Sequence, residues 1–228
     1  VVRCALGWAC WKTYVGRPER DQVRGLAMTV LGNGLTGAHR HEDALSVRQA
    51  ELSTLRRVGA SEAHILAVQG NLAVLYEELG RVEGALRMKQ DVYAGHLKLN
   101  GEDNLSTLMA ANNYAATLKD LRRFEEAKAL LRRTIPVARR VVGEGDGLTL
   151  RMRYTYARAL YEDPRSDPRA TLEYLREAVT TLEEIERTAR RVFGGSHPLT
   201  VEIERFLHKI PSTVRRAADL ESQVKRSV

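Results

Sequence analysis

The chain repeats itself with a period of 42 residues. The stretch "NLAVLYEELGRVEGAL" begins at Asn71, and the related stretch "NYAATLKDLRRFEEAK" begins 42 residues later at Asn113. A fainter third copy, "TYARALYEDPRSDPRATL", begins at Thr155, again 42 residues on. The same spacing separates three glycines: Gly59, Gly101 and Gly143. A period of this length indicates an array in which each repeat buries its apolar face only by stacking on its neighbours.

Each repeat is expected to contain two helices. In the copy that begins near Asn71, apolar residues fall at helical spacing from Leu66 to Tyr76, and again from Val82 to Leu97, with Gly80 between them. Small residues recur where the two helices must approach closely, because protein interiors are close-packed. These are Ala73, Ala115 and Ala157 in the first helices, and Ala85, Ala127 and Ala170 in the second helices.

These residues resemble the tetratricopeptide repeat, and the 42-residue period resembles that of kinesin light chains. Asn71-Leu72-Ala73 with Tyr76 and Gly80-Arg81 carry the resemblance, as do Asn113-Tyr114-Ala115 and Phe124-Glu125-Glu126-Ala127. The stretch "GGSHPLTV", residues 194–201, resembles the link between repeats of that family. The resemblance covers roughly residues 22–209. It implies an all-α, right-handed α-solenoid of helix-turn-helix repeats, in which the first helix of each repeat lines a concave surface that holds peptides.

The repeat spacing predicts how the chain is divided. We expect about four repeats and flanking helices: an N-terminal helix in 1–19, repeats at about 20–61, 62–103, 104–146 and 147–196, a partial repeat at 197–209, and a capping helix in 211–228. The fourth repeat is longer than the period, yet its apolar stripe continues without a break. We therefore predict one helix over 168–193, with Asp167 as its N-cap, Pro168 at its first position and an overhanging end.

One stretch suggests different chemistry. Gly32-Asn33-Gly34-Leu35-Thr36-Gly37 matches the G-x-G-x-x-G pattern of dinucleotide-binding loops. However, "RDQVRGLAM" before it has helical spacing, so no strand leads into the loop, and the repeat places Gly32 in the slot of Ala73. We interpret the stretch as a helix. Gly34 and Gly37 have no predicted packing role, so the first repeat is expected to be the least stable.

Composition narrows the remaining possibilities. The net charge is +7, 43% of residues are hydrophobic, and arginine and glutamate alternate along most of the chain. The sequence contains no run of 18 apolar residues, so we predict no membrane span. It has two cysteines, Cys4 and Cys10, a low number that suggests a reducing compartment, which we take to be the cytoplasm.

Catalytic motifs are missing from the sequence. The histidines are scattered, no HExxH, Walker A or GxSxG motif occurs, and adjacent glutamates such as Glu77-Glu78 point about 100° apart on a helix. We therefore expect no enzyme activity, no metal and no cofactor.

The resemblance also implies where a peptide would bind. Family pattern places an asparagine on the first helix of each repeat, here Asn71 and Asn113, and the repeat at 147–196 has Thr155 instead. Arg151 and Arg158 lie one helical turn to either side of Thr155 and suit carboxylates. A structural bond for the asparagines and ordinary solvation for the arginines remain alternatives.

The expected function is a non-enzymatic scaffold that binds a peptide, acidic or mixed in charge, of a partner protein. The basic charge leaves open a helical-repeat protein that binds nucleic acid, with arginines clustered at 56–57, 122–123, 132–133 and 139–140. A third possibility is a regulatory array of a larger enzyme or sensor.

Overall fold

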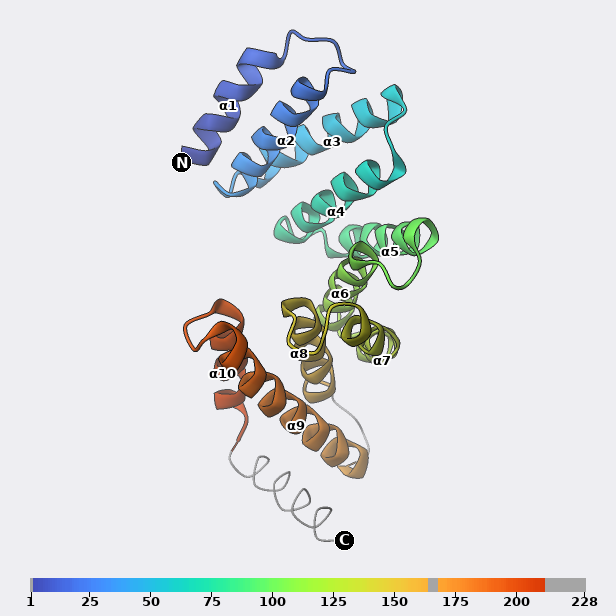
Figure 1. Ribbon diagram of the computed structural model, residues 1–228, viewed down its shortest axis with the longest axis vertical. Coiled ribbons are helices and arrows are strands. Elements are labelled where there is room, and N and C mark those ends of the chain that lie inside the picture. Colours follow the sequence, from blue (N-terminus) through green and yellow to red (C-terminus); the bar gives the residue numbers. More distant parts are fainter. Residues whose placement is uncertain (1, 164–167, 212–228) are drawn as a thin grey trace. The chain divides into compact units, whose positions relative to one another are not determined.

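The computed structural model describes residues 2–163 and 168–211, and only the backbone of residues 168–172. Every regular element in these ranges is an α-helix. They are α1 (Val2–Tyr14), α2 (Gln22–Thr36), α3 (His41–Val58), α4 (Glu62–Glu78), α5 (Val82–Asn100), α6 (Leu105–Asp120), α7 (Phe124–Val141), α8 (Gly147–Tyr161), α9 (Pro168–Phe193) and α10 (Pro198–Lys209). Their contacts divide the chain into two compact bodies, residues 1–99 and 100–228 (Figure 1). The predicted all-α repeat fold is therefore confirmed.

Polar caps and glycines set the ends of the helices. The Asp21, Asn104 and Asp146 side chains accept hydrogen bonds from backbone N–H groups in the first turns of α2, α6 and α8, which leaves fewer unpaired donors at these ends. Four glycines that follow long helices have left-handed backbone angles, with φ from 71° to 95°: Gly59, Gly101, Gly143 and Gly194. The recurring glycines of the sequence therefore mark helix ends, where glycine alone avoids a steric cost.

Small residues allow the helices of a repeat to touch. Ala73, Ala85, Ala115, Ala127 and Ala157 are all completely buried, as their spacing predicts. In α5, a Cβ atom on Gly84 would lie 2.8 Å from the ring of Tyr76, and one on Gly95 would lie 2.6 Å from Leu66, both on α4. A larger residue at these positions would force the two helices apart.

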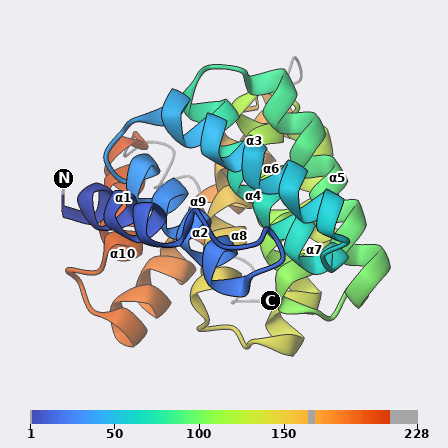
Figure 2. The ribbon, with the colours of Figure 1, turned by 90° about the horizontal axis from the view of Figure 1, so that it is seen from above.

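In the first body, two glycines of α2 also have packing roles. A Cβ atom on Gly32 would lie 2.8 Å from Nε of Arg48 on α3, so the missing side chain makes room for an arginine. A Cβ atom on Gly34 would lie 2.6 Å from the backbone oxygen of Arg3, so this glycine lets α1 lie against α2 (Figures 1 and 2). Gly37 lies just beyond the end of α2 and caps it.

The expectation that Gly34 has no packing role is therefore wrong. It fails because the sequence does not reveal that α1 packs across Gly34. Gly37 has no such close contact, but it lies at the end of α2 and not in its interior, so the cost expected for a glycine inside a helix does not apply there. The argument that the first repeat is the least stable therefore no longer holds. The helix α1 itself contacts the core through Cys4 and Trp11, whereas Trp8 and Val15, which share their spacing, are more than a third exposed.

A buried ion pair lies beside Gly32. Arg48 and Glu51 are 1% and 3% exposed, and Nη1 of Arg48 lies 2.5 Å from Oε2 of Glu51. Arg48 also donates to the side-chain oxygen of Asn33, and the hydroxyl of Thr29 donates to Glu51. Because the charges are removed from water, each depends on these partners for its solvation.

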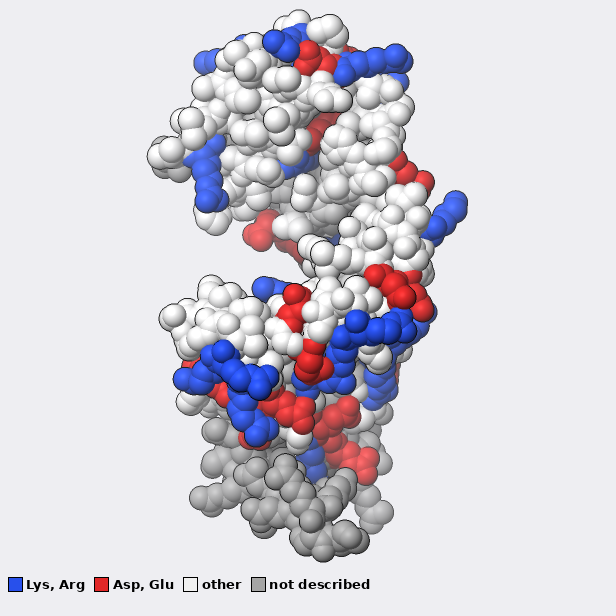
Figure 3. Space-filling view, in the orientation of Figure 1, with Lys and Arg blue, Asp and Glu red and all other residues white. Residues whose placement is uncertain are grey.

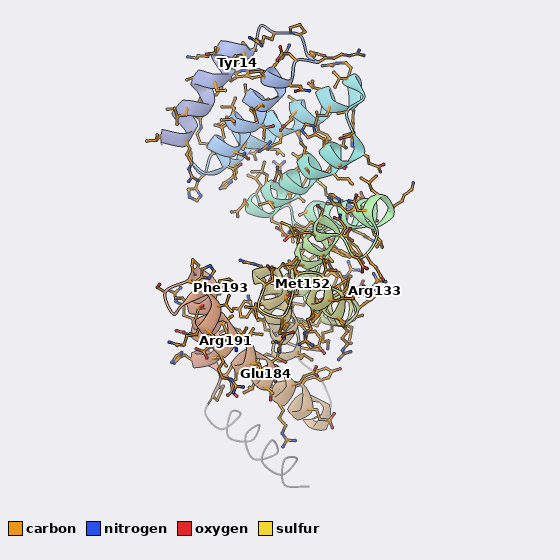
Figure 4. All side chains as sticks on the ribbon, viewed as in Figure 1. Tyr14, Arg133, Met152, Glu184, Arg191 and Phe193 are labelled. Carbon is orange, nitrogen blue, oxygen red and sulfur yellow. The ribbon has the colours of Figure 1, made fainter. Side chains whose placement is uncertain are left out.

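The second body is built around α8, which packs against α7 on one side and α9 on the other. Leu150 and Met152 of α8 are completely buried, and Met152 is labelled in Figure 4. The long helix is confirmed as α9, Pro168–Phe193, and buries Val179, Leu182 and Ile185. Its predicted N-cap, Asp167, lies outside the described residues, as does the predicted capping helix from residue 212 onward.

The far end of α9 does not overhang. The ring of Phe193 stacks on His197 at 4.6 Å between centroids, and Arg190 forms an ion pair with Glu204 of α10 at 2.6 Å. The glycine pair Gly194-Gly195 lets the chain turn back, so that α10 packs along the end of α9. The prediction of a free end is therefore wrong, because the partial repeat that follows covers it.

Replacing Gly32 with alanine should destabilise the protein by about 1–3 kcal/mol, since Arg48 is held by its partners and cannot move away from the new methyl group. Urea unfolding measures this change. Gly25→Ala is the matched control on the same helix: nothing lies within 4 Å of its Cβ position, so alanine should stabilise by up to about 1 kcal/mol. Equal effects of the two substitutions would contradict the role assigned to Gly32.

Arg48→Met should cost about 3–5 kcal/mol, because it leaves the Glu51 carboxylate buried without a cation. The double change Arg48→Met with Glu51→Leu should recover much of that loss. Arg57→Met is the control, because its ion pair with Glu19 is exposed and should contribute about 0–1 kcal/mol. A loss for Arg48→Met no larger than for Arg57→Met would show that the buried pair is not needed.

Candidate functional site

The second body contains a pocket of about 260 Å³ where α6, α8 and α10 meet. The helices α6 and α8 are the first helices of successive repeats and lie in contact, and α10 lies against α8. The side chains around the pocket are mostly polar or charged. They are Asn112, Asn113, Ala116, Lys119 and Asp120 from α6, Arg151, Tyr154, Thr155 and Arg158 from α8, and Glu202 from α10.

Four of the five residues predicted from sequence lie around this pocket. Asn113, Arg151, Thr155 and Arg158 come together because α6 and α8 run side by side with equivalent faces outward. Asn71 belongs to the first body, where it is exposed on α4.

Two of the pocket residues have unused binding capacity. The side chains of Asn113 and Arg151 are exposed and have no hydrogen-bond or ion-pair partner among the described residues. The amide of Asn113 can donate and accept at once, and the guanidinium of Arg151 offers five donors. A ligand would therefore find two unsatisfied groups on neighbouring helices.

Thr155 and Arg158 are already engaged. The hydroxyl of Thr155 donates to the backbone oxygen of Arg151 at 3.0 Å and lies 3.4 Å from the side-chain oxygen of Asn112. Arg158 forms two contacts with Glu162, of 2.8 and 2.7 Å. Its guanidinium also lies over the ring of Phe206, 5.3 Å from the centroid. These two residues shape the pocket more than they offer free groups to a ligand.

Several pocket residues were not predicted from sequence. Asn112 is buried beside the predicted Asn113, and the doublet itself is the signal that could have identified it. Lys119 and Asp120 pair with each other at the end of α6. Glu202 comes from α10, and only the packing of α10 on α8 brings it here.

The phenol of Tyr154 is held in its neutral form. Burial, and next the charge of Glu202, raise the pKa of Tyr154 to about 12. The hydroxyl therefore stays a hydrogen-bond donor at neutral pH, and it lies beside a carboxylate that can accept.

A second pocket, of about 320 Å³, lies among α7, α8 and α9. Two of its arginines, Arg153 and Arg139, already form ion pairs, and the third, Arg132, donates to the hydroxyl of Tyr156. Arg153 contacts Glu144 and also Glu184 at 2.5 Å, and Arg139 contacts Glu144 at 2.6 Å. Glu184 is labelled in Figure 4. Because these charges neutralise one another, this pocket offers a ligand less than the first.

The described residues contain neither a cluster of metal ligands nor a helix suited to cross a membrane. Nowhere in residues 2–163 and 168–211 do three histidine, cysteine, aspartate or glutamate side chains gather as metal ligands. Within the same ranges, no helix combines the length and apolar character required to cross a bilayer.

Two tyrosines of α8, Tyr154 and Tyr156, should titrate late in the folded protein. Burial raises the pKa of Tyr156 to about 12, as for Tyr154. Since both pKa values rise on folding, the stability that they contribute is complete below about pH 10 and is lost as the pH rises toward 12. Tyrosinate absorbance measures this titration. Tyr154→Phe should reduce the rise in absorbance above pH 11 by the amount expected for one tyrosine. An unchanged rise above pH 11 would contradict the pKa assigned to Tyr154.

Comparison with known proteins supports the repeat architecture. The tetratricopeptide repeat profile matches residues 65–105 and 107–146. None of the curated proteins matches the chain in sequence. Among solved structures, BtubC (BKLC) from P. vanneervenii is 15% identical over 98% of this chain and 91% of its own, with a TM-score of 0.65.

Two other solved structures are similar. A Podosopora anserina protein described as a kinesin light chain with nearly identical TPR-like repeats is 20% identical over 82% of this chain and 83% of its own, with a TM-score of 0.63. A Rap protein complexed with competence and sporulation factor is 16% identical over 86% of this chain and 54% of its own, with a TM-score of 0.54. At these identities the similarity establishes the fold. The profile match identifies residues 65–105 and 107–146 as tetratricopeptide repeats, and the solved structures show that the chain shares the fold of proteins built from such repeats.

Proposed function

We propose that the chain is a non-enzymatic scaffold that binds an extended peptide segment of a partner protein along the first helices of its repeats. The observation that carries this proposal is the pocket between α6 and α8, where the Asn113 amide and the Arg151 guanidinium are exposed and unpaired.

The chemistry of these two groups suits a peptide. One amide side chain can donate to a backbone carbonyl and accept from a backbone N–H, which satisfies one peptide unit whatever its side chain is. A guanidinium binds a carboxylate through two parallel hydrogen bonds. Asn113 therefore serves affinity for any extended chain, and Arg151 adds a preference for an acidic group.

Asn71 supports the same mode of binding in the first body. It occupies the position of Asn113 one period earlier and is likewise exposed, without a partner among the described residues. Two repeats thus present the same free amide.

The alternative of nucleic-acid binding has less support. The arginine clusters that suggested it are largely engaged: Arg57 pairs with Glu19, Arg123 with Glu126, and Arg140 with Asp103. Figure 3 shows acidic and basic side chains lying next to one another on the surface of the second body. A nucleic-acid surface usually carries a continuous basic stripe.

Replacing Asn71 and Asn113 together with alanine should abolish capture of the partner protein and leave the thermal midpoint unchanged, because both side chains are exposed and unpaired. Affinity purification with the immobilised chain measures capture, and calorimetry measures the midpoint. Gln49→Ala with Gln90→Ala is the matched control, since it removes two exposed amides from the second helices α3 and α5. If the asparagine variant retains the same partners as the wild type, the proposed surface is wrong.

A further inference from the structure

The charges of the pocket between α6, α8 and α10 cancel except at two places. Lys119 is 5% exposed and contacts Asp120, with Glu162 3.9 Å away. Arg158 is held by the same Glu162. These four side chains satisfy one another, so they add little net charge to the pocket.

The first uncompensated charge is Arg151 on α8. Its guanidinium lines the pocket and has no acidic partner among the described residues. A carboxylate placed here would gain a charge-assisted hydrogen bond without displacing an existing one.

The second uncompensated charge is Glu202 on α10. Its neighbour is the Tyr154 hydroxyl, a neutral donor, and no cation of the described chain lies within ion-pair distance of it. Arg151 and Glu202 do not form an ion pair with each other, although both line the same pocket. The pocket therefore presents a positive group and a negative group that remain separate.

We infer that this pocket selects a peptide segment that carries one acidic and one basic side chain, the acidic one bound by Arg151 and the basic one by Glu202. This inference rests on the proposed peptide-binding function and specifies its ligand. Glu202 is the residue that determines specificity, because it adds a repulsive element against ligands that are only acidic.

The geometry explains why a purely acidic segment should bind less well. Its second carboxylate would face Glu202, and like charges placed opposite each other repel. A mixed segment instead forms a favourable pair at each end. The Tyr154 hydroxyl helps to orient Glu202 and does not neutralise it.

The test uses the full chain and short synthetic peptides that share one neutral backbone and differ only in charge: two glutamates, two lysines, one of each, or none. Fluorescence anisotropy measures affinity. The wild type should bind the mixed peptide about tenfold more tightly than the two-glutamate peptide. Glu202→Gln should remove that difference by improving binding of the two-glutamate peptide, and Arg151→Gln should weaken both peptides that contain glutamate.

Two controls separate local charge from net charge. Arg191→Gln and Glu173→Gln make the same charge changes at exposed positions of α9 that do not line the pocket, and Arg191 is labelled in Figure 4. Both should leave the order of the peptides unchanged.

The outcomes distinguish the two proposals. If the wild type binds peptides but does not prefer the mixed one, or if Glu202→Gln changes nothing, the inference about charge selection is overturned and the peptide-binding function stands. If all four peptides fail to bind the wild type, the proposed function itself is overturned at this pocket.

Discussion

The close approach of paired helices is the constraint on which the rest of this structure depends. Completely buried alanines recur wherever the first and second helices of a repeat meet, and glycines on α2 and α5 allow still closer contacts. Since overpacking such contacts costs about 1–3 kcal/mol each, the identity of these small residues fixes the spacing of the helices. That spacing in turn determines which side chains on the outer faces of α6 and α8 are close enough to form one pocket.

Local sequence was enough to predict the helices, and long-range contacts were not. The long helix α9 follows from an unbroken apolar stripe, and the small-residue slots follow from the period. The role of Gly34 could not be predicted, because it depends on α1 crossing α2 at that point. The same reason hides the contact of Gly32 with Arg48: periodicity predicts that the slot is small, but not that an arginine of α3 fills the space.

For the candidate site, the sequence predicted which residues face outward on α6 and α8. It did not predict which of these side chains already have a partner within the protein. Asn113 and Arg151 are free, whereas Arg158 is held by Glu162 and Phe206, and no spacing rule distinguishes one arginine from the other. Glu202 was missed because it comes from a helix that the sequence assigned only to a partial repeat. What a repeat surface can bind is therefore set less by the number of its charged residues than by which of them lack an internal partner.

The buried charges make the repeats of this chain non-interchangeable. Arg48, Lys89 and Leu131 occupy equivalent positions in successive second helices, and the buried Lys89 pairs with Glu77 of α4 at 2.5 Å. One period after Glu77, α6 carries the buried Lys119. Placing α5 against α6 in the manner of a repeat would therefore bring two lysines together in the interior. The helix α6 is therefore a poor partner for α5, and a rearranged chain that paired these two helices would need a compensating change of charge at one of the two lysines.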